Sequence, residues 1–179
     1  MKKTIFFCLA IIVVISIPLK LYTVDFSIPT HSDDFDYILY AIQYSEGDFF
    51  LSQKKNPGWP LFLTPFMSLL NSEHFLDYSN FARTLTLTIS TITIFPIYVL
   101  ARKFFSEKYS VVAAGLFAFE PHLNYNSGTP FSEPLVILVL ITTMIFILHD
   151  KTKYHYLAFV FAGFCWWVRL EVIYPIIAI

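Results

Sequence analysis

Long apolar runs separated by polar segments organise this chain. Residues 4–24 are almost entirely apolar, interrupted chiefly by Ser16, Pro18 and Lys20, and a helix of about 20 residues spans a hydrocarbon core of about 30 Å. No small-residue cleavage site follows this run, which favours an uncleaved membrane anchor over a signal peptide. Similar runs occupy residues 84–100, 109–119, 134–148 and 156–168, the last resuming at 172–179. The pattern predicts five spanning helices.

One long segment, residues 25–81, separates the first two spans and is too apolar to be a free soluble domain. Residues 36–45 have the aromatic and aliphatic faces of a helix that lies in the headgroup region. Residues 54–60 contain two prolines and a glycine, which exclude a regular helix there, and a second interfacial helix is expected over residues 61–70. The predicted fold class is all-α: a multi-pass transmembrane helical bundle with a long outer loop that carries interfacial helices.

Composition and charge narrow the class of protein. The 179 residues are 56% hydrophobic and 19% aromatic, with a mean hydropathy of +0.62, which indicates an integral membrane protein. The net charge is −1, and the lysines that set the orientation in the membrane account for the basic residues that could otherwise form a basic patch. The absence of such a patch argues against a nucleic-acid partner. Cys8 and Cys165 lie within apolar runs without a pairing or metal-ligand spacing, and we interpret them as core thiols.

Basic residues fall on alternate connections between the spans, and this pattern predicts the orientation in the membrane. They are Lys2, Lys3, Arg102, Lys103, Lys108, Lys151 and Lys153. Short loops rich in lysine and arginine stay in the cytoplasm, so we expect a cytoplasmic N-terminus. Most acidic residues fall on the opposite side, which makes the outer face the chemical one. The expected compartment is the plasma membrane in a prokaryote or the endoplasmic reticulum in a eukaryote.

An acidic cluster follows the first span, with Asp33, Asp34 and Asp36 beside His31. Carboxylates at the outer lip of a bilayer can accept a proton from a hydroxyl or hold a divalent cation, so the chain is a candidate enzyme acting on lipid-borne material. The same aspartates could instead form a solvated face or supply the N-terminal charges of the next helix. His31 could add a metal ligand, although a lone histidine usually is not one.

A second polar segment, residues 120–134, joins the third and fourth spans. The fourth span has roughly 15 residues and reaches only about 22 Å. Polar backbone here would lie below the headgroups, where it must be buried in protein or line a wet cavity. The segment is therefore expected to help form a site. Its last acid, Glu133, could instead cap the following helix, as could Ser132.

These motifs together resemble the N-terminal half of the type C membrane glycosyltransferases, which include protein O-mannosyltransferases and lipid A aminoarabinose transferases. The matching residues of the first outer loop are Asp33, Asp34, Tyr37, Ala41, Gly47 and residues 56–62. Further matches follow in the family's order at Arg83, residues 102–105, Pro121, residues 132–134 and residues 166–171. The sequence departs from the family pattern at Asp34, where relatives often carry glutamate. This leaves open which of Asp33 and Asp34 takes which catalytic role.

The resemblance implies transfer of a sugar from a polyprenyl-phosphate donor to a lipid, glycan or protein acceptor at the outer face, with inversion at the anomeric carbon. Asp33 or Asp34 would be the base that takes the acceptor proton, or would orient the acceptor through a divalent metal ion. Glu133 is a candidate for substrate binding. The departing phosphate calls for cations and hydrogen-bond donors, and the outer-side candidates are Arg83, Arg169, Lys54, Lys55 and His122.

Several of these cations also have a plainer interpretation. Lys54 and Lys55 are more often headgroup contacts, and Arg83 could anchor a helix end by snorkelling. Arg169 lies with Glu171 among apolar residues, where charges are costly and tend to mark a pathway or a pair.

Members of the resembled family run to several hundred residues, so residues 1–179 are expected to be the N-terminal part of the transferase domain and to be inactive in isolation. The alternative is a non-catalytic membrane protein, such as a transporter subunit or an assembly factor. A transporter would place its polar residues near the bilayer midplane within broken helices, whereas most acids here fall in the outer loop.

Overall fold

The computed structural model describes residues 3–30, 33–49, 56–70, 72–172 and 174. These residues form eight α-helices, one short 3-10 helix and no β-strand, which confirms the predicted all-α class. In chain order the elements are α1 (Lys3–Tyr22), α2 (Asp33–Ser45), α3 (Gly58–Leu70), α4 (Phe75–Ala101), α5 (Glu107–Phe119), α6 (Pro121–Ser127), α7 (Glu133–Ile147), α8 (Thr152–Val168) and the 3-10 helix η1 (Leu170–Val172).

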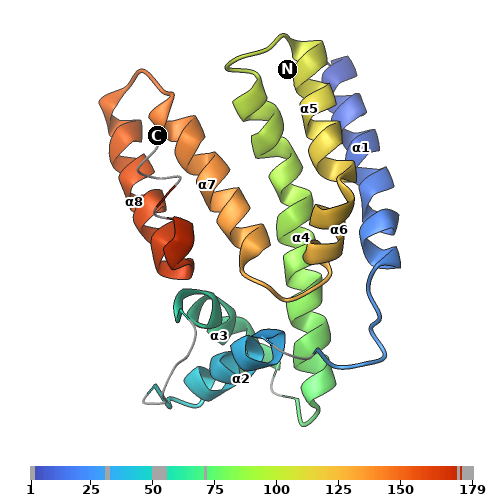
Figure 1. The fold of residues 1–179 in the computed structure, drawn as a ribbon, viewed down its shortest axis with the longest axis vertical. Helices are drawn as coiled ribbons and strands as arrows, with labels where there is room; N and C mark the ends of the chain where they lie inside the picture. Colours follow the sequence, from blue (N-terminus) through green and yellow to red (C-terminus); the bar gives the residue numbers. More distant parts are fainter. Residues whose placement is uncertain (1–2, 31–32, 50–55, 71, 173, 175–179) are drawn as a thin grey trace.

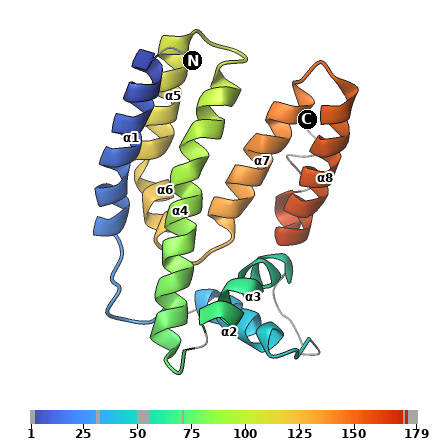
Figure 2. The same ribbon diagram turned by 180° about the vertical axis from the view of Figure 1, so that it is seen from behind.

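The helices form an upright bundle above a layer of two helices that lie across its lower end (Figure 1). α1, α4 and α5 stand side by side with α6 below α5, and α7 and α8 form a second pair, of which α7 packs against α4 (Figures 1 and 2). α2 and α3 make up the lower layer. The start of α1, the α4–α5 connection and the α7–α8 connection all lie at the upper end. The connections that carry the basic residues therefore gather at one end of the bundle, as the predicted alternation requires.

Among the helices that the structure describes, α1 and α4 are long and apolar enough to cross a membrane. Their 20 and 27 residues correspond to about 30 and 40 Å. α5, α7 and α8 have 13, 15 and 17 residues, fewer than the usual length of about 20 residues. The continuation of the last expected span over residue 173 and residues 175–179 lies outside the described residues. Large apolar side chains on the outside of the bundle are exposed, among them Phe7, Leu116 and Phe159, which suits contact with lipid.

The two lower helices begin earlier than the sequence pattern predicts. α2 starts at Asp33 rather than at residue 36, and α3 starts at Gly58 rather than at residue 61. The expectation that residues 54–60 exclude a regular helix is therefore wrong for the last three of them. A proline is tolerated in the first turn, because its nitrogen needs no helical hydrogen-bond partner there.

A short helix that the sequence analysis did not predict, α6, occupies part of the polar segment between α5 and α7. Glu120 caps its start, since the carboxylate Oε2 accepts a hydrogen bond from the backbone nitrogen of Leu123 at 2.5 Å. Pro121 follows at the start of the helix. An acid followed directly by a proline is a helix-start signal, so this helix could have been found from the sequence.

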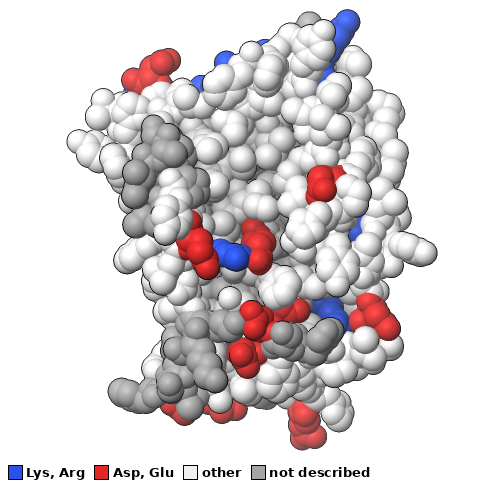
Figure 3. Space-filling view, in the orientation of Figure 1, with Lys and Arg blue, Asp and Glu red and all other residues white. Residues whose placement is uncertain are grey.

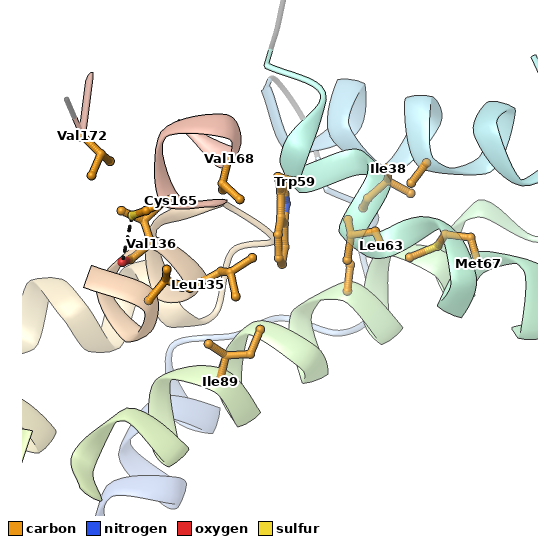
Figure 4. Packing of buried hydrophobic residues seen from close by; sticks show 13 residues of the cluster. Ile38, Trp59, Leu63, Met67, Ile89, Leu135, Val136, Cys165, Val168 and Val172 are labelled. Carbon is orange, nitrogen blue, oxygen red and sulfur yellow. Dashed lines mark hydrogen bonds between the residues drawn. The ribbon is translucent and has the colours of Figure 1, made fainter. Parts of the chain in front are cut away.

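A hydrophobic core joins the lower layer to the bundle. It contains Ile38 of α2, Trp59 and Leu63 of α3, and residues of α4, α7 and α8 such as Val168 (Figure 4). A second, smaller cluster lies between α1, α4 and α5. The predicted core thiol Cys165 belongs to the first cluster, and both cysteines of the chain are free. The first core fixes the position of α2 and α3 beneath the ends of α7 and α8.

Candidate active site

The acidic cluster forms the first turn of α2. Asp33 is exposed, whereas Asp34 is only 6% exposed. Asp34 shares the buried face of α2 with Ile38 and Ala41, which follow four and seven residues later, and this is the spacing of one side of a helix. The helical periodicity therefore places one aspartate inside the protein and the other outside.

The environment of Asp34 favours the protonated carboxyl. Its Oδ1 atom is buried and accepts no hydrogen bond from the residues that the structure describes. Burial raises the pKa of Asp34 to about 7, the negative charges of Glu133 and Asp33 act in the same direction, and the charge of Arg83 opposes them. A carboxyl group that titrates near neutrality can both take up and release a proton at physiological pH. Such groups are typical of functional sites.

Arg169, which follows the last turn of α8, joins two glutamates. Its Nη1 atom forms an ion pair with Glu133 Oε1 at the start of α7, and its Nε atom donates to Glu171 Oε2 at 2.8 Å. The hydrogen bond from Arg169 lowers the pKa of Glu171. Glu133 Oε2 is buried and has no hydrogen-bond partner within the described part of the chain. Ser132, the residue before α7, makes no side-chain capping bond, whereas Glu133, the first residue of α7, is bound to Arg169.

Charged side chains gather where the lower ends of α7 and α8 approach α2 and α3, whereas much of the bundle above is uncharged on the same face (Figure 3). The charge of Glu133 acts on the carboxyl of Asp34, and Glu133 is paired with Arg169. The structure thus brings together Asp34, Glu133 and Arg169 from three separate helix ends. We call this group the outer charge cluster, after the orientation predicted from the sequence.

Arg83 has a different set of contacts. It is buried on α4, and its Nη1 atom donates to the backbone carbonyl oxygens of Asp25 and Ile28 at 2.9 and 2.8 Å. The guanidinium therefore ties the segment after α1 to α4, which is not the geometry of a snorkelling anchor. Its positive charge also acts on Asp34.

Of the remaining candidates, one is an exposed histidine and the others lie outside the described residues. His122 is exposed on α6, and its Nε2 atom lies 3.2 Å from Asn126 Nδ2. His31, Lys54 and Lys55 lie outside the described residues. No group of three or more histidine, cysteine, aspartate or glutamate side chains within the described residues could hold a metal ion. Metal binding by Asp33 and Asp34 stays a prediction.

One residue that links the lower layer to this site was not singled out from the sequence. Trp59 is fully buried, and its indole Nε1 donates to the carbonyl oxygen of Pro130 at 2.8 Å. The sequence motif around Trp59 did not predict this contact, because its partner lies 71 residues away in the sequence.

Comparison with protein-family models gives a match over residues 54–179 to the family described as dolichyl-phosphate-mannose-protein mannosyltransferase. The match includes Glu133 and Arg169 of the outer charge cluster and begins after Asp34. Proteins of this family are glycosyltransferases that use a polyprenyl-phosphate sugar. Neither the curated proteins nor the solved structures gave a match to this chain.

Proposed function

The chain belongs to the dolichyl-phosphate-mannose-protein mannosyltransferase family, and we propose that it transfers a sugar from a polyprenyl-phosphate carrier to a lipid, glycan or protein acceptor at the outer face of the membrane. The observation that carries this proposal is Asp34, a buried carboxyl whose Oδ1 atom receives no hydrogen bond from the described residues. A base that must take a proton from a bound acceptor needs a free oxygen atom and a pKa close to the working pH. The unpaired Oδ1 atom of Asp34 and its raised pKa support this role.

The proposed step is a single displacement. The acceptor oxygen or nitrogen attacks the anomeric carbon of the sugar and gives its proton to Asp34, while the bond between that carbon and the phosphate oxygen breaks. The electron pair of the broken bond leaves with the lipid phosphate, and the configuration at the anomeric carbon is inverted. Proton transfer to a positioned base contributes about 10²- to 10⁴-fold in such reactions.

Negative charge grows on the departing lipid phosphate, and nearby cations would stabilise it. Arg169 is the best-placed candidate of the described residues, because its guanidinium lies in the outer charge cluster and two carboxylates hold it in place. Glu133 would orient Arg169 and the substrate. Further proposed donors to the phosphate or sugar are Arg83, Lys54, Lys55 and His122. A divalent ion bound by Asp33 and Asp34 is an alternative way to orient the acceptor.

We also propose that the N-terminus is cytoplasmic and that α2 and α3 face the outside, in the plasma membrane of a prokaryote or the endoplasmic reticulum of a eukaryote. The gathering of the basic connections at the upper end of the bundle supports this orientation. In this orientation the outer charge cluster would lie at the outer headgroup level, where a lipid phosphate lies.

The test uses the complete reading frame that contains this chain, expressed in membranes and supplied with a labelled polyprenyl-phosphate sugar. We expect Asp34→Asn to lower transfer by at least about 100-fold. Asp33→Asn should have a smaller effect, because Asp33 is exposed. Asp36→Asn removes the third acid of the same helical turn and is the matched control.

Each outcome of this test decides a separate point. Undiminished transfer by Asp34→Asn with a loss in Asp33→Asn would move the base to Asp33. Undiminished transfer by both variants would refute an aspartate base altogether. If the wild-type protein transfers sugar from no carrier, the non-catalytic alternative, a transporter subunit or an assembly factor, is favoured.

A further inference from the structure

Trp59 stands at the junction between the lower layer and the bundle. Its ring packs against Phe62 with centroids 5.5 Å apart, and it lies between Val168 at the end of α8 and Leu63 of α3 (Figure 4). The indole nitrogen is its polar atom, and this atom donates to the carbonyl oxygen of Pro130. A buried carbonyl with a single identified donor is costly to leave unpaired.

The first turn of α3 contacts both chain segments that lead into the outer charge cluster. Pro130, the partner of Trp59, lies three residues before Glu133. On the other side, Gly58 lies so close to the end of α8 that an added Cβ would be 2.5 Å from the carbonyl oxygen of Trp167. The next residues along that segment lead to Arg169. Both members of the Glu133–Arg169 ion pair are therefore connected to α3 through a few residues of backbone.

The same helix is packed against α2, which carries Asp34. Ile38 and Ala41 of α2 share one core with Leu63 and Met67 of α3, and all four side chains are almost completely buried. A movement of α3 relative to α7 and α8 would therefore carry Asp34 with it.

We propose that Trp59 is a positioning residue for sugar transfer: its hydrogen bond to Pro130 holds the α2–α3 pair so that Asp34 faces the Glu133–Arg169 ion pair. This inference rests on the proposed function. Trp59 itself lies in the hydrophobic core and acts through the helices that it joins. A displacement of about 1 Å at reacting groups can cost about 100-fold in rate, so one hydrogen bond at this junction is enough to matter.

The position of Asp34 has a readout besides the rate. The charged groups that act on it are Asp33 of its own helix, Arg83 of α4 and Glu133 of α7, the last paired with Arg169. If the α2–α3 pair shifts, Asp34 becomes more hydrated and lies farther from Glu133. Both changes favour its ionised form, so the acidic limb of the pH profile of kcat/KM should move to lower pH.

The experiment compares Trp59→Phe, which keeps an aromatic ring and removes the donor, with Trp166→Phe, an exposed tryptophan of α8, as the matched control. Both are made in the full-length membrane protein. For Trp59→Phe we expect kcat to fall at least about tenfold, KM for the lipid-linked donor to change little and the acidic limb to shift. Trp166→Phe should leave all three unchanged.

A second variant separates loss of the hydrogen bond from loss of ring volume. Benzothienylalanine at position 59 has nearly the shape of tryptophan but carries sulfur in place of the N–H. If Trp59→Phe is not recovered in a folded form, this variant tests whether the hydrogen bond to Pro130 is required. A wild-type kcat and an unshifted profile in this variant would overturn the role of Trp59 and leave the proposed transfer intact. Absence of transfer in the wild-type protein would overturn the proposed function itself.

Discussion

The burial of Asp34 predicts that its carboxylate destabilises the folded protein at neutral and alkaline pH. Its pKa rises from 3.8 in a free side chain to about 7 in the folded chain. Between these two values the folded state binds more protons than the unfolded state, so the free energy of unfolding falls as the pH rises through this window. A difference of about three units between the two pKa values corresponds to a loss of at most about 4 kcal/mol in the free energy of unfolding. Asn at this position cannot ionise and avoids this loss.

The assay is chemical unfolding in detergent micelles at several pH values from 4 to 8, followed by tryptophan fluorescence. The difference in unfolding free energy between Asp34→Asn and the wild type should grow in favour of the variant as the pH rises, and level off above about pH 7. Asp36→Asn, in the same helical turn but half-exposed, controls for the loss of a charge at the start of α2. A difference that is constant with pH, or that shrinks as the pH rises, would refute the assignment of a buried and weakly acidic Asp34.

Two further predictions concern the packing that positions the site. Gly58→Ala should lower the free energy of unfolding by about 1–3 kcal/mol, because its Cβ would meet backbone atoms of α8 at 2.5–2.7 Å. Gly163→Ala is the control: its Cβ would have nothing within 4 Å, so it should raise the free energy of unfolding by up to about 1 kcal/mol. Equal effects of the two variants in the same unfolding assay would contradict the close approach of Gly58 to α8. Arg83→Met should release the segment over residues 25–28 from α4. A cysteine placed at the buried Thr30 should then react faster with a maleimide than the same cysteine in a protein that keeps Arg83. An unchanged reaction rate would contradict the role of Arg83 in holding this segment against α4.

Most helices could be predicted from the sequence because they depend on local properties. The apolar runs locate α1, α5, α7 and α8 to within a few residues. α4 shows the limit of this method, since the apolar run begins at residue 84 and the helix begins at Phe75. An apolar run marks only the part of a helix that suits the hydrocarbon core. The first turns of α4 contain polar as well as apolar residues, so the run does not include them.

The arrangement of the candidate residues could be predicted in part. The difference between Asp33 and Asp34 could have been derived, because Asp34 has the helical spacing of Ile38 and Ala41 and Asp33 does not. The pairing of Arg169 with Glu133 could not, since the two residues are 36 positions apart and meet only because α7 packs along α8. Periodicity shows which face of a helix is buried but not which helix covers it.

The unequal lengths of the helices explain how an ion pair is accommodated in a chain that crosses a membrane. α4 has 27 residues and α7 has 15, so α4 is longer by about 18 Å, and α2 and α3 lie beneath the ends of α7 and α8 beside its lower part (Figure 1). Glu133 and Arg169 therefore stand at helix ends that face α2 and α3. Ionised side chains exposed to hydrocarbon are costly, and here each has a partner and a protein neighbour. In the proposed reaction the same arrangement would let a carboxylate, an arginine and a lipid phosphate meet at the headgroup level, so the proposed chemistry would depend on the shortness of α7 and α8.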